Sequence, residues 1–176
     1  MTPSHSQPQH LHELGTTILA TENHIEYQGK FLIHRRSDSK KLFPGFLIGP
    51  GGQIDEGEDV MAAASREIRE ETGVTVHPES IKLKAVGIHH RLDHGEVWVN
   101  FVTRSTLTSP PEIIKHSLEG TSAWLSLDEL LASDKIFPPS KFYHDHVLPD
   151  RPGIMYTNLE WENYTLTRVL SQTVAL

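Results

Sequence analysis

The hydrophobic positions of residues 59–72 repeat with the period of an α-helix. The side chains that this period places on one side of the helix are Met61, Ala64, Ile68 and Thr72. Asp59 suits the N-cap, because its carboxylate can accept hydrogen bonds from the first unpaired backbone N–H groups, and Gly73 stands where a left-handed C-cap is expected. The pattern therefore predicts a helix over about residues 59–72, with one side turned to the core.

Several other segments alternate hydrophobic and polar residues with the period of two that indicates a β-strand. The strands predicted in this way are residues 14–21, 27–36, 81–88, 96–103 and 122–125. The first two are expected to pair as a hairpin around a polar turn at residues 22–24, and the next two around a turn at residues 92–95. Ser126, with Glu129 three residues later, forms a capping box that predicts a further helix.

The C-terminal part has a less regular pattern. The segment 138–148 can form a helix that begins at a Pro-Pro pair, and residues 158–172 are predicted as a last helix. The side chains predicted to face inward from this last helix are Leu159, Tyr164, Leu166 and Leu170. Residues two apart on a helix point about 160° away from each other, so His144 and His146 are not expected to bind one metal ion together. Neither an internal repeat nor a second domain is apparent.

Three glutamates of the first predicted helix share one face. Glu67, Glu70 and Glu71 fall within an arc of about 100°, because positions three and four apart are neighbours on a helix surface. Like charges this close repel and raise one another's pKa, and a divalent cation such as Mg²⁺ or Mn²⁺ would compensate them. The alternative is a solvated acidic face with Arg66 and Arg69 as partners.

The stretch from Gly52 to Val74 resembles the Nudix box, Gly-x5-Glu-x7-Arg-Glu-(aliphatic)-x-Glu-Glu-x-Gly-(aliphatic), and matches every fixed position of that pattern. The flanking strands extend the resemblance to about residues 14–132. It implies an α/β fold, the Nudix-type α/β/α sandwich with a mixed sheet between helices. It also implies a hydrolase that cleaves a diphosphate linkage, with a MutT-like nucleoside triphosphate, a nucleotide sugar or ADP-ribose as the type of substrate.

The same resemblance implies roles for individual residues. The metal ligands for Mg²⁺ or Mn²⁺ that it implies are Gly51 (through its carbonyl), Glu58, Glu67, Glu70 and Glu71. The residues implied in catalysis are Arg66, Glu67, Glu70 and Glu119. Arg66 is expected to orient a glutamate by a bidentate ion pair, and Glu58 has the alternative of stabilising the helix N-terminus. Arg35, Arg36 and Gly52 are expected near the substrate phosphates, with an exposed basic pair as the alternative for the two arginines.

Nudix hydrolases commonly take a further carboxylate from the loop before the last core strand. Glu119 and Glu112 are the two candidates in this chain. Glu119 is preferred, because it precedes Gly120 at the start of that strand, where a flexible glycine lets the loop fold over the metal. A structural role for both glutamates is the alternative.

The composition agrees with one compact unit, since 176 residues suffice to bury a core. We expect a mobile N-terminal arm over residues 1–12, which are rich in polar residues and lack apolar periodicity, and a single domain over residues 13–176. The chain has no cysteine, which excludes disulfides, zinc thiolates and cysteine nucleophiles.

A formal net charge of −7 argues against binding of nucleic-acid polymers, whose affinity rests on Lys and Arg at the phosphates. No run approaches the ~18 apolar residues of a membrane span, so a cytoplasmic protein without a membrane partner is expected. The expected partner is a small nucleotide diphosphate derivative. The sequence leaves open whether the chain forms a homodimer. Two alternatives to an enzyme remain, a catalytically inactive Nudix fold that binds or senses nucleotides and an interaction protein.

Overall fold

A computed structural model gives the structure of the protein and describes residues 15–40, 43–109, 111, 116–117 and 119–176. The predicted arm at residues 1–12 lies outside the described residues, as does Glu112. The part of the chain that is described includes the whole stretch that resembles the Nudix box.

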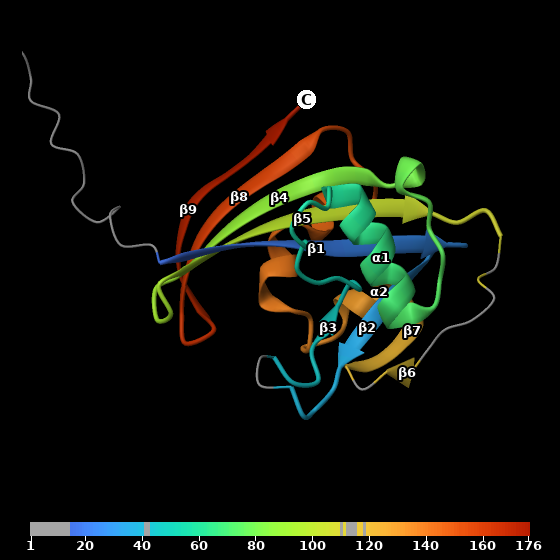
Figure 1. Ribbon diagram of the computed structural model, residues 1–176, viewed down its shortest axis with the longest axis horizontal. Helices are drawn as coiled ribbons and strands as arrows, with labels where there is room; N and C mark the ends of the chain where they lie inside the picture. Colours follow the sequence, from blue (N-terminus) through green and yellow to red (C-terminus); the bar gives the residue numbers. More distant parts are fainter. Residues whose placement is uncertain (1–14, 41–42, 110, 112–115, 118) are drawn as a thin grey trace, which may run out of the picture.

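A mixed β-sheet forms the centre of the molecule (Figure 1). Its strands are β1 (Thr16–Tyr27), β2 (Lys30–Arg36), β3 (Leu47–Ile48), β4 (Lys82–Arg91), β5 (Glu96–Thr106), β6 (His116–Ser117), β7 (Gly120–Ser126), β8 (Ile154–Glu162) and β9 (Thr165–Ala175). The strand order is β6-β7-β2-β1-β5-β4-β8-β9, and β3 pairs with β2. The β1–β5 and β4–β8 pairs are parallel, whereas the remaining pairs are antiparallel.

Helices cover both faces of this sheet. They are α1 (Val60–Thr72), α2 (Leu127–Leu131) and α3 (His144–Val147), with 3₁₀ turns η1 (Pro78–Ser80) and η2 (Pro138–Phe142). In Figure 1, α1 crosses in front of the sheet and the orange segment that contains α3 lies behind it. The expected three-layer α/β/α arrangement with a mixed sheet is therefore confirmed. Within the described part of the chain, no helix is both long and apolar enough to cross a membrane.

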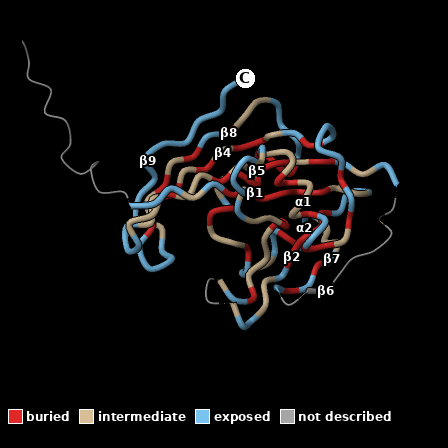
Figure 2. The backbone as a smooth tube through the Cα atoms, viewed as in Figure 1, coloured by how far each residue is buried: buried red, intermediate tan, exposed pale blue. Residues whose placement is uncertain are grey.

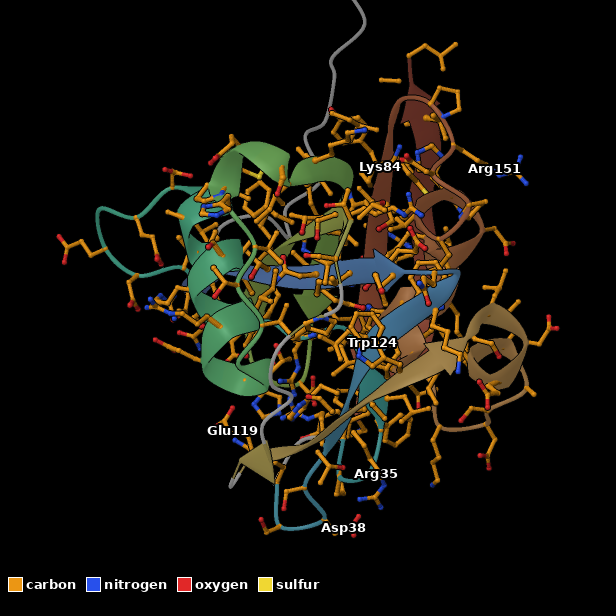
Figure 3. All side chains as sticks on the ribbon, turned by 90° about the vertical axis from the view of Figure 1, so that its right-hand side faces the viewer. Arg35, Asp38, Lys84, Glu119, Trp124 and Arg151 are labelled. Atoms are coloured by element: carbon orange, nitrogen blue, oxygen red, sulfur yellow. The ribbon has the colours of Figure 1, made fainter. Side chains whose placement is uncertain are left out.

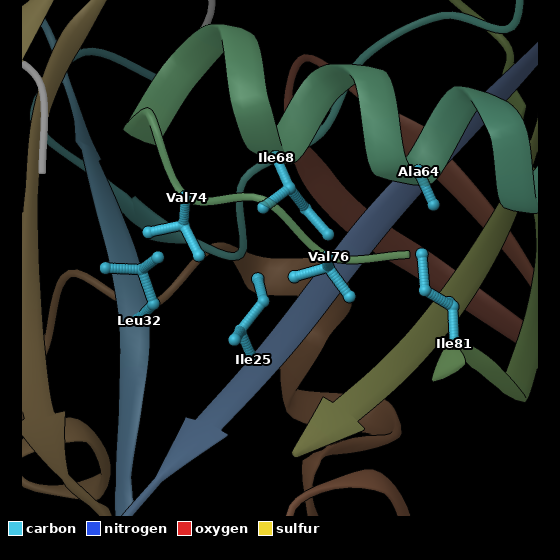
Figure 4. Packing of buried hydrophobic residues seen from close by; sticks show 7 residues of the cluster. All are labelled: Ile25, Leu32, Ala64, Ile68, Val74, Val76 and Ile81. Carbon is cyan, nitrogen blue, oxygen red and sulfur yellow. The ribbon is translucent and has the colours of Figure 1, made fainter. Parts of the chain in front are cut away.

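The helix α1 forms as its sequence pattern predicts. Asp59 Oδ1 accepts hydrogen bonds from the backbone N–H groups of Met61 (2.8 Å) and Ala62 (3.0 Å), and Gly73 ends the helix with a φ of 77°. Its inner side packs on β1 and β2 in the cluster drawn in Figure 4. The buried residues of this cluster are Ile25, Leu32, Ala64, Ile68, Val74, Val76 and Ile81.

The opposite face of the sheet carries a separate core. Phe31 and Ile33 alternate with Leu32 along β2, so their side chains leave the sheet on the other side and pack against Leu130 of α2. Further along the sheet, α3 packs on β4, β5 and β8. Figure 2 shows buried residues in the central strands, whereas β9 at the edge is mostly exposed.

The turn predicted at residues 22–24 is wrong. β1 continues through Glu22, Asn23 and His24, all of them buried, and the chain reverses at Gln28 and Gly29, which have φ angles of 50° and 76°. The polar side chains are tolerated inside the fold because they find partners there. Asn23, for example, accepts a hydrogen bond from the hydroxyl of Thr103 (2.6 Å).

The last helix predicted at residues 158–172 is also wrong, because the chain forms the hairpin β8–β9 there. Alternate residues of β8 are buried, namely Met155, Thr157, Leu159 and Trp161. The hairpin reverses at Asn163 and Tyr164, which both have positive φ angles (47° and 62°). Tyr164 and Leu170, predicted to face inward, are exposed instead. The segment 138–148 forms η2 and the short α3 rather than one continuous helix.

Candidate functional site

A cavity of about 380 Å³ opens beside the C-terminal half of α1. Its lining includes carboxyl groups, cationic side chains and aromatic rings. Glu22, Glu71 and Glu119 contribute the carboxyl groups, and the backbone of Gly51 and Gly52 lies beside them. The aromatic residues that line the cavity are Phe43, Trp98, Phe137, Trp161 and Tyr164. The cavity therefore combines an acidic group with a wall suited to a flat apolar group.

Glu71 is the most deeply placed carboxyl of the box helix. It is buried, and its Oε2 accepts a hydrogen bond from the backbone N–H of Gly51 (2.9 Å). Burial raises the pKa of Glu71 to about 8, and the nearby carboxylates of Glu67 and Glu119 act in the same direction. The ionised form of Glu71 is therefore unfavourable unless a cation binds beside it.

Glu119, in the segment before β7, lies beside Glu71. Its carboxylate hydrogen-bonds with the Glu71 carboxyl. Its Oε1 also accepts a hydrogen bond from Nζ of Lys40 (2.6 Å), which is the main reason why the pKa of Glu119 is lowered. The structure therefore brings the preferred loop glutamate to the box helix, although 48 residues of sequence separate it from Glu71.

Glu67 lies against the glycine-rich loop that leads into α1. A Cβ atom at Gly52 would stand 2.5 Å from Oε1 of Glu67, so a larger residue there would displace the Glu67 carboxylate. Burial raises the pKa of Glu67, and the carboxylates of Glu70 and Glu119 add to the shift against the opposing effect of Arg66. Arg66 donates from Nη1 to Oε1 of Glu67 (2.7 Å).

Arg66 also binds the first glutamate of the box. Its Nε and Nη2 donate to the two carboxylate oxygens of Glu58, at 3.0 Å and 2.8 Å, and hydrogen bonding to Arg66 lowers the pKa of Glu58. The carboxylate of Glu70 is more exposed, with one oxygen 3.4 Å from Nη1 of Arg66. Glu58, Glu67 and Glu70 thus lie around Arg66, and Glu67 and Glu71 also contact the glycine-rich loop.

The predicted substrate-binding residues separate in space. Arg36 lines the cavity, and Arg35 is not among the lining residues. Arg35 is half exposed and donates to Asp38 (2.9 Å) in the adjoining loop, where Figure 3 labels both residues. Lys40, which the sequence pattern did not single out, lines the cavity beside Glu119. The carbonyl of Gly52 accepts from the backbone N–H of Thr21 (2.8 Å), which fixes the loop on β1.

Sequence reasoning missed the aromatic wall altogether. Phe43 packs edge-to-face on Phe137 (ring centroids 4.8 Å apart) and on Tyr164 (5.0 Å). The guanidinium of Arg91 stands over the Tyr164 ring at 5.2 Å. These residues come from four distant segments, so no local spacing could have joined them. One sequence signal for this wall was available. Residues of β8 alternate between buried and more exposed positions, and Trp161 of the wall is one of the buried ones.

The donor set of the acidic group suits a hard divalent cation. Glu67, Glu71 and Glu119 gather three carboxylates, and burial together with mutual repulsion makes the Glu71 carboxylate unfavourable without a compensating charge. Carboxylate oxygens are the ligands preferred by Mg²⁺ and Mn²⁺. The chemistry of these donor groups therefore fits the metal that the box pattern implies.

Comparison with known proteins agrees with this geometry. Residues 13–146 match the family model described as the NUDIX domain. The m7GpppN-mRNA hydrolase NUDT17 of Xenopus laevis is 34% identical over 77 residues, which cover 44% of this chain and 26% of that protein. The uncharacterized Nudix hydrolase YfcD of Salmonella typhi is 27% identical over 113 residues, covering 63% and 58%. The matches thus span less than two thirds of the length of these curated relatives.

Solved structures show the same architecture. The MutT protein from Bacillus halodurans superposes with a TM-score of 0.72 at 25% sequence identity, covering 89% of this chain and 97% of that one. The MutT NUDIX hydrolase from Burkholderia pseudomallei has a TM-score of 0.62 at 24% identity, covering 74% and 98%. The first of these likenesses covers most of the chain.

Proposed function

This chain belongs to the Nudix hydrolase family, and we propose that it is a metal-dependent enzyme that hydrolyses the diphosphate linkage of a nucleoside di- or triphosphate derivative. One observation carries the proposal. The carboxyl groups of Glu71 and Glu119 line a cavity that also has a wall of aromatic rings, and the carboxylate of Glu67 lies near enough to raise the pKa of Glu71. A phosphate-bound metal and a flat base would find their partners side by side there.

The proposed ligands of Mg²⁺ or Mn²⁺ are Glu67, Glu71 and Glu119, with Glu70 and the carbonyl of Gly51 as further contributors. When bound, such an ion neutralises phosphate charge and lowers the pKa of a bound water, which supplies a nucleophile at neutral pH. Glu58 is assigned instead to holding Arg66, because both of its carboxylate oxygens accept hydrogen bonds from that side chain.

The protein's own groups position these carboxylates. Arg66 fixes one oxygen of Glu67, and the backbone N–H of Gly51 fixes one oxygen of Glu71. Because both constraints come from the box helix and the loop before it, the two carboxylates keep their relative orientation without a ligand. Such positioning of charged groups ahead of the reaction is a main source of catalysis in phosphoryl chemistry.

The cationic side chains that line the cavity are suited to the phosphates. Arg36 and Lys40 both stand in its lining, and Lys40 contacts Glu119. A guanidinium and an ammonium at this place would attract a polyphosphate and offset the acidic group for an incoming anion. Arg35 is not assigned to the substrate, because it pairs with Asp38 away from the cavity.

The aromatic wall is assigned to the base. Stacking of a nucleobase on an aromatic side chain contributes about 1–3 kcal/mol and tolerates different bases. Trp98, Trp161 and Tyr164 offer such faces, and the cavity of about 380 Å³ is in the size range of small-molecule sites. A derivative that carries a base is therefore favoured over an inorganic polyphosphate.

A panel of nucleotides tests this function. Oxidised and normal nucleoside triphosphates, ADP-ribose, a nucleotide sugar and dinucleoside polyphosphates should be assayed for phosphate or pyrophosphate release, with Mg²⁺, Mn²⁺ or EDTA. A methylated cap dinucleotide belongs in the panel, because the relative from Xenopus laevis is named as an m7GpppN-mRNA hydrolase.

We expect at least one nucleotide to be hydrolysed only with metal, and inorganic polyphosphate to be a poor substrate. Tight nucleotide binding without turnover under every metal condition would instead indicate a nucleotide-binding module. Hydrolysis that persists in EDTA would contradict the assignment of the carboxylates to a metal.

A further inference from the structure

A second group of potential metal ligands lies beneath the cavity. Glu22 and His24 come from β1 and His144 comes from α3, and their ligand atoms all lie within 4.8 Å of one another. All three side chains are at least nine-tenths buried, with exposed fractions of 1%, 0% and 5%. This group shares no residue with the glutamates of the box helix.

The imidazole rings in this group are poorly satisfied. Both ring nitrogens of His24 and Nδ1 of His144 have no hydrogen-bond partner among the described residues. His24 Nε2 lies 3.3 Å from Oε1 of Glu22, so this ring nitrogen faces the carboxylate. Buried polar atoms normally have partners, so unpaired nitrogens facing a carboxylate point to a missing ligand.

The spacing suits a small cation. Zinc bonds of about 2.0 Å at tetrahedral angles place two ligand atoms roughly 3.3 Å apart. The nitrogen of His24 and the oxygen of Glu22 already have this separation. The widest separation allowed in the group, 4.8 Å, exceeds this value by roughly 1.5 Å, so an ion would have to draw the ligand atoms closer together.

The donor atoms select the type of metal. Two imidazoles and one carboxylate suit Zn²⁺ and similar first-row ions, whereas Mg²⁺ prefers oxygen ligands alone. We propose that Glu22, His24 and His144 form a structural site for a divalent transition metal ion, Zn²⁺ in particular, distinct from the carboxylate site on the box helix.

Neighbouring hydroxyl groups orient the carboxylate of this site. Ser140 donates to Oε1 of Glu22 at 2.7 Å, and Tyr143 donates to Oε2. Metal-binding carboxylates are typically held by such outer hydrogen bonds, and a carboxylate has lone pairs enough for both donors and a metal. Ser140 and Tyr143 are themselves fully buried, so this arrangement is fixed by the fold.

The site would join two distant parts of the chain. Glu22 and His24 belong to the second half of β1, whereas His144, Ser140 and Tyr143 belong to the segment η2–α3. Because Glu22 also lines the cavity, an ion could reach the site from there, and its binding would stiffen the cavity floor. The site therefore has an access path and a structural consequence.

Metal content tests this proposal directly. Metal-free protein should be loaded with Zn²⁺, dialysed against buffer with excess Mg²⁺ to occupy the box carboxylates, and analysed by elemental mass spectrometry. We expect one Zn²⁺ per chain in the wild type and none in His24→Gln and His144→Gln. His146→Gln is the matched control, because His146 lies two residues further along α3 and its Nε2 contacts the carbonyl of Gly153 (3.1 Å); it should keep its Zn²⁺.

Co²⁺ provides a second measurement that needs no variant. Bound to two imidazoles and a carboxylate with low coordination number, Co²⁺ should give the intense visible absorption of a four-coordinate ion, and Mg²⁺ should not displace it. A wild-type protein that retains no Zn²⁺ and shows only the weak spectrum of six-coordinate Co²⁺ would overturn the proposal, whether or not the variants fold. Retention of Zn²⁺ by folded His24→Gln and His144→Gln would overturn it as well.

Discussion

Arg66 holds Glu58 in a two-point ion pair, with Nε 3.0 Å from Oε1 and Nη2 2.8 Å from Oε2. The same guanidinium reaches Oε1 of Glu67 at 2.7 Å through Nη1. Arg66 therefore connects the loop before the box helix to a glutamate of the acidic group. A planar fork of donors is required for this arrangement, and a lysine cannot reproduce it.

The first prediction concerns this fork. Arg66→Lys keeps the charge but loses the bidentate contact, so Glu67 should be less well oriented and turnover should fall by ~10- to 100-fold with a raised requirement for metal. The measurement is the dependence of the rate on Mg²⁺ concentration. Arg69→Lys, on the exposed side of the same helix, is the control. Equal metal dependence in both variants would contradict the positioning role of Arg66.

The second prediction concerns the three glutamates of the box helix. Glu67→Gln, Glu70→Gln and Glu71→Gln should each lower turnover by at least ~100-fold, because charge stabilisation of the reaction depends on them. The metal-free variants should stay folded or gain stability, since each loses one of several repelling carboxylates. Rates and melting temperatures measure this, with the exposed Glu79→Gln as control. Wild-type turnover in any two of the three would refute the metal assignment.

The third prediction concerns Glu119. Glu119→Gln should lower activity at low metal concentration by roughly 10-fold or more, because the weakened site binds metal in a smaller fraction of the molecules. Excess Mn²⁺ should restore part of the activity. The rate measured across a Mn²⁺ titration is the test. Glu129→Gln, which affects only the cap of α2, should behave like the wild type.

Glu112→Gln belongs in the same experiment, because Glu112 is the alternative carboxylate. It should also behave like the wild type. A loss in Glu112→Gln alone would transfer the role to that residue, and full activity in both variants would show that the box works without this segment.

The fourth prediction concerns pH. Burial lowers the pKa of His89 from its ordinary value of about 6.5 to about 4. The facing charge of Glu22 opposes this shift and His90 adds to it, while Trp161 donates to Nδ1 of His89 at 3.2 Å. Between about pH 6.5 and pH 4 the unfolded chain binds a proton that the folded chain does not, so stability should fall as the pH is lowered through this window.

The expected loss from His89 is at most roughly 3.5 kcal/mol in the free energy of unfolding, taking about 1.4 kcal/mol per pH unit over the shift of the pKa from 6.5 to about 4. Urea unfolding of metal-free protein at about pH 7 and pH 4.5 measures it. His89→Gln should show a shallower dependence than the wild type, whereas the exposed His77→Gln should not. An unchanged slope in His89→Gln would contradict a neutral buried imidazole.

Much of the box could be predicted from the sequence, because its determinants are local. The determinants of α1 lie within that one helix. Asp59 caps its N-terminus, Gly73 ends it in a left-handed conformation, and Ile68 stands at the helical spacing that faces the core. The capping box of Ser126 and Glu129 forms for the same reason. Glu119 could be ranked above Glu112 because a glycine next to it marks the start of a strand.

The remaining features depend on contacts between distant segments. The polar run at residues 22–24 looked like a turn, since its buried partners Ser140 and Tyr143 lie more than a hundred residues away. The segment 158–172 contains apolar residues at helical spacing as well as at alternate positions, and the pairing of β8 with β4 decides between them. The single-domain extent over residues 13–176, the cytoplasmic location and the oligomeric state stay predictions.

The central claim is that the box carboxylates hold the metal on which hydrolysis depends. Calorimetric titration of Mn²⁺ into metal-free wild-type protein and into the Glu67→Gln/Glu71→Gln double variant tests it most directly. We predict that the wild type binds Mn²⁺ and that the double variant, still folded, binds it at least ~100-fold more weakly, because both carboxylate ligands are replaced by neutral amides. Equal Mn²⁺ affinity in the two proteins would contradict the account.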